Sequence, residues 1–393
     1  MIKKLLLSSI SLLDFLVPKK HNYYLFSSAP DVSDNVLSFF RYLYSEGKCN
    51  DKLIFWMLND VKDAIYYQDF LQNLLEEKQI KVKFITRNSL TGLYYYLRSK
   101  FVFFSHGIYK GVIIPKSHIV VNLWHGMPIK KIGLLDSSDQ VSNASLVTVT
   151  SKKYQKIFGK AFDMREDNVL ITGQPRCDEL FTSRVIADNV PFLMNRKKNI
   201  VWMPTYRRSI KGDIRVDGKY VDGFEVLNLQ DLNKLDNYLE QHNYSFIIKL
   251  HPMDVLNNYE FDVYQNITII KDIDISDCNI TLYELLSCSD LLLTDYSSVY
   301  IDYLLTNKPV AFFMSDFDDY LNHRGFVFNN PVDIMPGKFI SNYNELIFYL
   351  DEIFSGFDEF KEQRKKVNKM LNFFKGNFSQ RIFEELKNRY NFG

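Results

Sequence analysis

Short apolar runs alternate with amphipathic segments along the first half of the chain. The apolar runs end at polar residues, Gly or Pro, as buried strands do, and the segments between them repeat apolar residues every three to four positions, as helices do. We expect strands at residues 23–28, 52–58, 80–86, 100–105, 117–124, 145–151 and 168–173, and helices at residues 31–47, 63–78 and 90–99. Strands separated by helices form βαβ units and a parallel sheet.

The alternation starts again after a polar stretch at residues 185–199, which has no regular pattern and carries a basic cluster. The second series has expected strands at residues 200–205, 245–252, 267–272, 290–298 and 309–314, and its clearest expected helices lie at residues 281–289, 298–307, 360–374 and 379–390. The pattern therefore predicts an α/β fold of two tandem Rossmann-like domains that face a cleft. We expect an N-terminal helix at residues 1–20, a first domain at 21–190, a second at 191–375 and a C-terminal helix at 376–393 that packs back on the first domain.

The first twenty residues predict an amphipathic helix. One face of the helix carries Ile2, Leu5, Leu6, Leu13 and Leu16, and the opposite face carries Lys4, Ser8 and Ser11. The segment is too short to span a bilayer, and Asp14 and the lack of a small-residue cleavage site argue against a secretory signal. Two alternatives remain open, a helix on an anionic membrane surface and a helix packed on the domain core.

Composition limits the class of protein. Apolar residues make up 46% of the chain, which is ample for a sizeable core. The formal net charge is +1, from 48 basic and 47 acidic side chains, so no nucleic-acid partner is predicted and any anion site must be local. The four cysteines form no C-x-x-C pair and indicate reduced thiols in a cytoplasmic protein.

A histidine stands where one of the apolar runs of the first half ends. His125 is followed by Gly126, which permits an unusual backbone angle, by Pro128, which fixes the turn, and by Lys130 and Lys131. In open parallel sheets, ligands bind beyond the carboxyl ends of the strands. His125 is therefore a candidate general base for an attacking hydroxyl, with Gly126 and Lys130 on the acceptor side.

Two hydroxyls follow a strand-like run in the second half, in the stretch TDYSS. The strand is expected to stop at Thr294 and Asp295, and a helix to begin near Ser298 with Ser297 or Ser298 as its N-cap. The N–H groups of a helix start together with two hydroxyls form a cradle for phosphate, although a capped helix without a ligand fits the same residues. The position beyond a core strand favours phosphate, with Asp295 either ordering the turn or holding a polyol hydroxyl.

Further candidates also follow strand-like runs. His251, in KLHP, can donate a proton to a phosphate oxygen, and the alternative is a strand-end histidine bonded to backbone. Arg207 and its neighbour Arg208 suit phosphate oxygens if they line the cleft, and are otherwise surface charge. The acidic groups at 272–274 and 316–319 resemble metal-holding pairs, but such pairs are common in loops and no zinc spacing occurs, so no metal and no cofactor are predicted. The chain has neither a P-loop nor a G-x-S-x-G motif.

Six stretches occur in a specific order, namely NLWHGMPIKKIG, ITGQPRCDEL, WMPTYRRS, IIKLHP, LLLTDYSSVYIDYLLTNKPVAFF and HRGF. Together they resemble the CDP-glycerol glycerophosphotransferase family of teichoic acid and capsule synthesis, over roughly residues 100–330 with extension to both ends. The resemblance implies a glycosyltransferase-B-type fold with an acceptor domain and a CDP-donor domain. It also implies CDP-glycerol or a related CDP-alditol as donor, and phosphodiester formation with release of CMP.

The resemblance also implies roles for single residues. It makes His125 the catalytic base and His251 the second essential histidine, near the donor phosphates. The residues that match the donor-side motifs are Arg207, Thr294, Asp295, Ser297, Ser298 and Arg324. The sequence departs from the family at Met127, where members usually have Thr, and at Cys177, where they often have Asn.

These departures leave the acceptor and the alditol open. The resemblance implies a lipid-linked saccharide or polyol-phosphate acceptor at the inner face of the cell membrane, where the protein would be peripheral. In length the chain resembles the compact members that add a first unit to a lipid-linked sugar, and compact chains also occur in capsule synthesis. A nucleotide-sugar glycosyltransferase or a sugar-nucleotide epimerase on the same scaffold is the alternative, and a non-enzymatic module that binds anionic polymer is a third hypothesis.

Overall fold

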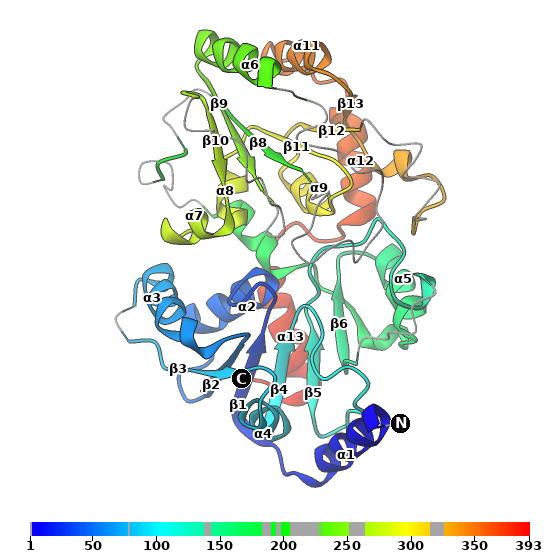
Figure 1. Ribbon diagram of the computed structural model, residues 1–393. Helices are drawn as coiled ribbons and strands as arrows, with labels where there is room; N and C mark the ends of the chain where they lie inside the picture. The colour runs from blue at the N-terminus through cyan, green and yellow to red at the C-terminus, as the bar shows by residue number, and fades with distance from the viewer. Residues whose placement is uncertain are drawn as a thin grey trace. The chain divides into compact units, whose positions relative to one another are not determined.

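The computed structural model describes residues 2–77, 79–136, 143–182, 190–193, 198–204, 227, 229–250, 264–314 and 326–393, with the side chains of residues 2–6 left out. The chain divides into two compact units (Figure 1). Unit 1 comprises Met1–Met127, Ile132–Glu179 and Leu371–Gly393, and unit 2 comprises Pro128–Lys131 and Leu180–Met370.

These boundaries differ from the expected ones at residues 190 and 375. The polar stretch at 185–199 suggested the joint, yet its described part buries Val190, Phe192 and Leu193. Unit 1 instead ends within the 3-10 segment Pro175–Phe181. Composition alone does not show which side chains are packed, so the division by contacts and the expected domain limits differ, and the latter stay a prediction.

The described strands of unit 1 form one parallel sheet. They are β1 (Lys20–Ser27), β2 (Leu53–Leu58), β3 (Val82–Thr86), β4 (Ser99–Phe104), β5 (Ile119–Asn122), β6 (Leu146–Val149) and β7 (Val169–Ile171). Their order is β3-β2-β1-β4-β5-β6-β7, and all described pairs are parallel. The chain direction across the sheet reverses between β1 and β4, which is the switch point where such sheets bind ligands.

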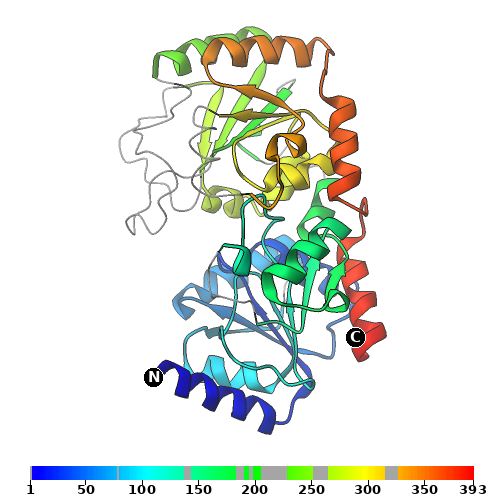
Figure 2. The same ribbon diagram turned by 90° about the vertical axis from the view of Figure 1, so that its right-hand side faces the viewer.

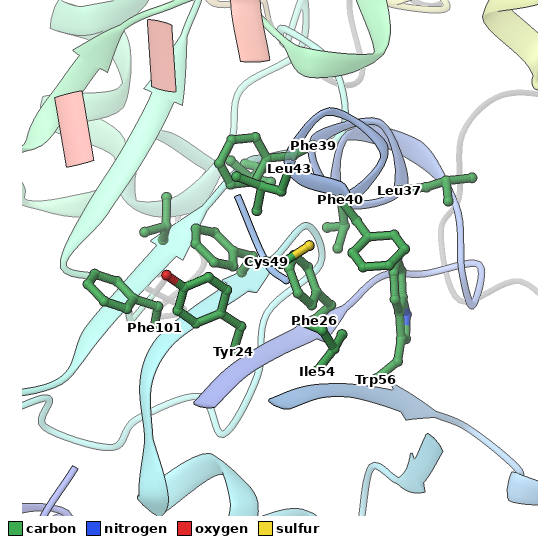
Figure 3. Close-up of a cluster of buried hydrophobic side chains, with 14 of the residues drawn as sticks. Tyr24, Phe26, Leu37, Phe39, Phe40, Leu43, Cys49, Ile54, Trp56 and Phe101 are labelled. Carbon is green, nitrogen blue, oxygen red and sulfur yellow. The ribbon is translucent and has the colours of Figure 1, made fainter. Parts of the chain in front are cut away.

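Both faces of this sheet are buried. Successive residues of a strand point to opposite sides of the sheet, so each strand contributes to both faces. In β1, Tyr24 and Phe26 join one apolar cluster while Leu25 joins the other. Figure 3 shows the first cluster, in which Phe26 and Trp56 from the strands lie below Phe39 of helix α2 (Asp34–Ser45). Two buried faces explain why these strands are continuous apolar runs in the sequence.

The first cluster also includes the end of the chain. Helix α13 (Phe378–Tyr390) packs beside α2 and contributes Ile382, Phe383 and Leu386. The backbone N–H groups of Phe378 and Ser379 donate to the Asp178 carboxylate at 2.8 and 2.9 Å. Asp178 therefore caps α13, although desolvation raises the pKa of this carboxyl above its usual range.

Helices α1 (Ile2–Leu16) and α4 (Leu90–Arg98) lie side by side on unit 1 (Figures 1 and 2). Both apolar and polar residues of α1 face the protein, since Ile10, Ser11 and Asp14 are buried and Leu7 packs against the same apolar cluster as Ile10. The Ser11 hydroxyl accepts from the Ile113 N–H at 3.0 Å. Asp14 is bonded by His118 Nδ1 at 2.9 Å and by Lys19 Nζ at 2.5 Å.

Other apolar side chains of α1 are exposed. The exposed fractions are 61% for Leu12, 44% for Leu13, 59% for Phe15 and 67% for Leu16. The helix therefore packs on the core of unit 1 through Leu7 and Ile10, as one of the two alternatives predicted, while these four side chains stay exposed. No helix in the described residues is long and apolar enough to cross a bilayer.

The described strands of unit 2 repeat the same plan. They are β8 (Lys198–Met203), β9 (Tyr244–Lys249), β10 (Ile267–Ile270), β11 (Leu291–Thr294), β12 (Val310–Phe313) and β13 (Lys338–Ile340), in the order β10-β9-β8-β11-β12-β13. All described pairs are parallel, and the order reverses between β8 and β11. The predicted fold class, α/β with two doubly wound parallel sheets, is confirmed.

The remaining helices are α3 (Ala64–Leu75) and α5 (Lys152–Phe162) in unit 1, and α6 (Leu229–His242), α7 (Asp272–Asp277), α8 (Leu282–Ser287), α9 (Val299–Tyr303), α11 (Tyr343–Phe354) and α12 (Lys361–Leu371) in unit 2 or at its end. Helix α9 is shorter than the expected helix at 298–307, because a 3-10 turn, Leu304–Thr306, replaces its second half and Asn307 ends it in the left-handed conformation.

Candidate functional site

His125 lies in a tight turn directly after β5. Trp124 has a positive φ of 59° and Gly126 a φ of 125°, so the chain reverses abruptly around the histidine. Two hydrogen bonds hold Trp124. Its backbone N–H donates to Asn122 Oδ1 at 2.9 Å, and its Nε1–H donates to the Gly126 carbonyl at 2.8 Å. His125 is half-buried and lies at the carboxyl edge of the sheet.

The hydrogen bond of His125 fixes its proton. Nδ1 lies 3.0 Å from the backbone carbonyl of Ser105, at the end of β4. A carbonyl can only accept, so Nδ1 carries the hydrogen and donates it. In the neutral ring, Nε2 then keeps its lone pair, as a general base requires.

A second histidine accompanies the first. His106 follows Ser105, and its ring stacks on the His125 ring with 4.0 Å between centroids and 20° between planes. Trp124 is another near-parallel neighbour of His125, at 4.3 Å and 28°. The sequence analysis did not single out His106, although His-Gly follows the apolar run of both strands.

A buried asparagine holds the turn from below. Asn35 Nδ2 donates to the carbonyls of Leu123 and Trp124 at 3.1 and 3.0 Å and to Gln174 Oε1 at 2.9 Å, and Asn35 Oδ1 accepts from the Arg176 N–H at 3.2 Å. The Arg176 side chain in turn pairs with Asp34 Oδ1 at 2.6 Å. The stretch ITGQPRCDEL thus supports the His125 turn and, through Asp178, the last helix.

The residues after Gly126 lead into unit 2. Lys130 forms an antiparallel bridge with Phe326, and the Val327 N–H donates to the Ile129 carbonyl at 2.9 Å. Phe326 directly follows the HRG motif that contains Arg324. The stretch after His125 and Gly126 is therefore paired with the stretch after the R-G motif.

The two departures from the family pattern are both internal. Met127 is fully buried, and Cys177 is 1% exposed. Their differences from the usual residues concern packing within their own units.

The TDYSS turn follows β11 at the switch point of the second sheet. Thr294 is fully buried and donates its hydroxyl to the Met203 carbonyl of β8 at 2.9 Å, which ties the two central strands together. Asp295 is also buried, at 3% exposure. These two residues shape the turn, while Ser297 and Ser298 are half-buried.

The serine hydroxyls do not cap α9 as expected. Ser298 occupies the N-cap position but makes no side-chain cap bond, and its backbone is already helical, with φ −67° and ψ −9°. An N-cap side chain reaches the helix N–H groups from an extended backbone, so this conformation explains the difference. Ser297 Oγ accepts from the Val299 N–H only at a long 3.5 Å.

Three of the expected site residues, His251, Arg207 and Arg324, lie outside the described residues. Leu250, just before His251, is buried. Lys249 is also buried, and its Nζ pairs with the Asp272 carboxylate at 2.8 Å.

The acidic group at 272–274 is explained by the fold. Asp272 is engaged by Lys249, and Asp274 Oδ2 accepts from the Lys271 N–H at 2.7 Å in a capping box. The group at 316–319 lies outside the described residues. Among the residues that the structure describes, no cluster of three or more His, Cys, Asp and Glu could hold a metal ion.

The family model described as CDP-Glycerol:Poly(glycerophosphate) glycerophosphotransferase matches residues 9–388. The chain is similar to the teichoic acid poly(ribitol-phosphate) polymerase of Bacillus spizizenii, at 29% identity over 86% of this chain and 52% of the relative. It is also similar to the teichoic acid glycerol-phosphate primase of Bacillus subtilis, at 28% identity over 68% of each chain. The chain thus spans about half the length of the first of these relatives.

A solved structure shares the fold. It is that of the wall teichoic acid polymerase TagF, in a variant with asparagine in place of a histidine and soaked with CDPG. The TM-score is 0.75 at 21% identity, over 98% of this chain and 93% of that chain.

Proposed function

The chain belongs to the CDP-glycerol:poly(glycerophosphate) glycerophosphotransferase family, and on that premise we propose that it transfers glycerol phosphate, or ribitol phosphate, from a CDP-alditol to a hydroxyl of a cell-envelope acceptor. The acceptor is a lipid-linked saccharide or a polyol phosphate. The proposal includes both alditols because one relative is named for ribitol phosphate and another for glycerol phosphate.

The observation that carries this proposal is the orientation of His125. Its Nδ1–H donates to the Ser105 carbonyl, which leaves Nε2 to take the proton of the acceptor hydroxyl. The freed oxygen attacks the phosphorus that bears the alditol, the bond from that phosphorus to the bridging oxygen breaks, and CMP leaves. Gly126 and Lys130 stand on the acceptor side of this step, next to the base in the chain.

The donor diphosphate is assigned to unit 2. The turn after β11 lies at the switch point of its sheet, and the Ser297 and Ser298 hydroxyls lie where Thr294 and Asp295 shape that turn. The other donor-side residues of the proposal are His251, Arg207 and Arg324, on the family resemblance. Phosphoryl transfer depends mainly on positioning and on stabilisation of charge, which such groups supply.

The test measures CMP release by the purified protein with CDP-glycerol and with CDP-ribitol, in the presence of a lipid-linked disaccharide or a polyol-phosphate acceptor. We expect CMP from at least one donor and none from UDP-linked sugars. His125→Ala should lower the rate by roughly 10²–10⁴-fold, the usual contribution of a general base. His21→Ala, at an exposed position of β1, is the matched control and should leave the rate unchanged.

Near-normal CMP release by a folded His125→Ala protein would falsify the role of the base. Turnover of a UDP-sugar without turnover of either CDP-alditol would support the nucleotide-sugar alternative instead.

We further propose that unit 1 binds an anionic membrane surface through α1. The exposed side chains of α1 are joined by Leu90 of α4 and by Ile113, with exposed fractions of 86% and 67%. Exposed lysines flank them in the sequence, at Lys20 and Lys116. Apolar side chains beside basic ones fit an interfacial helix at a lipid surface with anionic head groups.

Co-sedimentation with vesicles of phosphatidylglycerol and phosphatidylethanolamine tests this membrane proposal. The double substitution Leu12→Ser and Leu16→Ser should reduce binding at least tenfold, because each buried leucine contributes about 1.5–3 kcal/mol. Ile65→Ser, which changes a 77%-exposed apolar residue on α3, is the control and should bind as the unmodified protein does. Equal binding by the double variant would contradict the proposal.

A further inference from the structure

Two His-Gly turns leave the first sheet next to each other. His106 and Gly107 follow β4, and His125 and Gly126 follow β5. The two strands pair in parallel, with Phe104 opposite Asn122. Both glycines have a positive φ, 89° for Gly107 and 125° for Gly126, so the backbone turns sharply just after each histidine.

One residue orients both imidazoles. The Ser105 backbone carbonyl accepts from His125 Nδ1 at 3.0 Å, and the Ser105 hydroxyl lies 2.9 Å from His106 Nδ1. Ser105 itself is fully buried at the end of β4, so both contacts start from a fixed point. The near-parallel stack of the two rings, 4.0 Å apart, follows from this shared anchor.

His106 keeps an exposed side toward solvent, while its ring lies against its neighbours. Desolvation and then the adjacent His125 ring lower the pKa of His106 to about 3. Among the other charged groups that act on it, Asp34 raises the pKa while Arg176 and Arg87 lower it. Both of the largest effects favour the neutral form of the His106 ring.

We propose that His106 is a positioning residue for the general base: its ring holds the His125 imidazole in the orientation in which Nδ1 donates to Ser105, and stabilises the imidazolium that forms when His125 takes a proton. This inference rests on the proposed function, in which His125 is the base. It adds a second histidine of unit 1 to the reaction.

The physical reason lies in the charge of the two rings. The protonated His125 is a cation 4.0 Å from the face of a neutral π-system, which attracts it as aromatic faces attract cations. Stacking also removes rotational freedom from the base before the hydroxyl arrives. A permanent positive charge in place of His106 would instead repel the imidazolium.

Three substitutions separate stacking from charge. His106→Phe keeps a neutral ring and should retain the rate within about threefold. His106→Ala removes the ring and should lower kcat roughly tenfold with little change in KM, because the base is affected rather than substrate binding. His106→Arg keeps a planar group over His125 but makes it cationic, and should lower kcat further.

The titration of His125 itself is the measurement that a merely structural role of His106 would leave unchanged. With ¹⁵N-labelled histidine, NMR should show the Nδ1–H tautomer of His125 in the neutral protein without any substrate. In His106→Arg we expect the pKa of His125 to fall by about one unit or more, because a fixed cation disfavours a second one nearby. In His106→Phe it should stay close to that of the unmodified protein.

His242→Ala is the matched control. His242 is also an exposed, stacked histidine, 4.2 Å from Tyr238 on α6 of unit 2, and its loss should change neither kcat nor the titration of His125.

The outcomes distinguish the two proposals. If His125→Ala is inactive while His106→Ala and His106→Arg match the unmodified protein in kcat and in His125 titration, the role of His106 is wrong and the proposed function stands. If His125→Ala is active, the proposed function fails, and the role of His106 fails with it.

Discussion

The strand-end turns of the two sheets use their polar groups in opposite ways. In unit 1, the groups around the His125 turn bond to the protein itself: Asn35 reaches the carbonyls of Leu123 and Trp124, and Arg176 pairs with Asp34. In unit 2, the Ser298 hydroxyl makes no cap bond and the Ser297 contact is long. Both turns nevertheless lie at the carboxyl edge of a parallel sheet, and the TDYSS turn lies directly at its switch point.

The difference separates two tasks of a site. A general base must be oriented before the substrate arrives, and internal hydrogen bonds provide that orientation. A phosphate cradle needs donors that the fold has not already used, since a hydroxyl engaged in a strong cap has less to give a ligand. We therefore expect substitutions of the internally bonded groups in unit 1 to lower the stability of the protein. Substitutions of the serine hydroxyls in unit 2 should lower activity alone.

The largest effect on stability is expected at Asn35. Asn35→Ala removes a fully buried amide that bonds four groups, and leaves Gln174 Oε1 and the Arg176 N–H short of a partner. Each unsatisfied buried group costs about 1–3 kcal/mol, so we expect a loss of about 3 kcal/mol in the free energy of unfolding. Urea titration measures it, and hydrogen exchange of the Leu123–Gly126 amides shows whether the turn loosens first.

The matched change in unit 2 is Asn342→Ala. Asn342 Oδ1 accepts from the Glu345 N–H at the exposed start of α11, and its loss should cost only about 1 kcal/mol. Equal losses for the two variants would show that the Asn35 network is no more than an ordinary cap, and the contrast between the sheets would disappear.

Local patterns were enough to predict the two sheets. Runs such as residues 53–58 and 291–293 are apolar throughout because both faces of each sheet are covered, and that constraint appears in the sequence itself. His125 was found for the same reason, since the end of an apolar run is a local feature. The family was likewise predicted, because the motifs occur in a fixed order along the chain.

Contacts between distant residues could not be predicted in this way. The stack of His106 on His125 depends on the register of β4 and β5, and the repeated His-Gly was the one local signal of it. The capping of α13 by Asp178 joins residues two hundred positions apart. There, Gly173 has a φ of 83°, and a Cβ on it would lie 2.1 Å from Phe378 Cδ1.

Helix α1 shows a different limit of pattern analysis. Its amphipathic pattern was recognised, but the sequence could not show that buried polar contacts, of Ser11 with Ile113 and of Asp14 with His118, would accompany the packing of Ile10 and leave Leu12 and Leu16 exposed. A hydrophobic face predicts that something covers it and does not say what.

A smaller effect, on activity alone, is expected in the turn after β11. The double substitution Ser297→Ala and Ser298→Ala should change the free energy of unfolding by less than about 0.5 kcal/mol, because neither hydroxyl makes a strong bond to any residue that the structure describes. CMP release from the CDP-alditol should nevertheless fall roughly 10- to 100-fold, since a hydrogen bond to a charged group contributes about 1.5–3 kcal/mol.

Thr281→Ala is the counterpart within unit 2: its hydroxyl accepts from the Glu284 N–H at 3.2 Å in a true capping box, so stability should drop by about 1 kcal/mol while the rate stays unchanged. If the serine variant loses stability and keeps its activity, the two hydroxyls serve the fold, and the donor phosphates must be bound elsewhere.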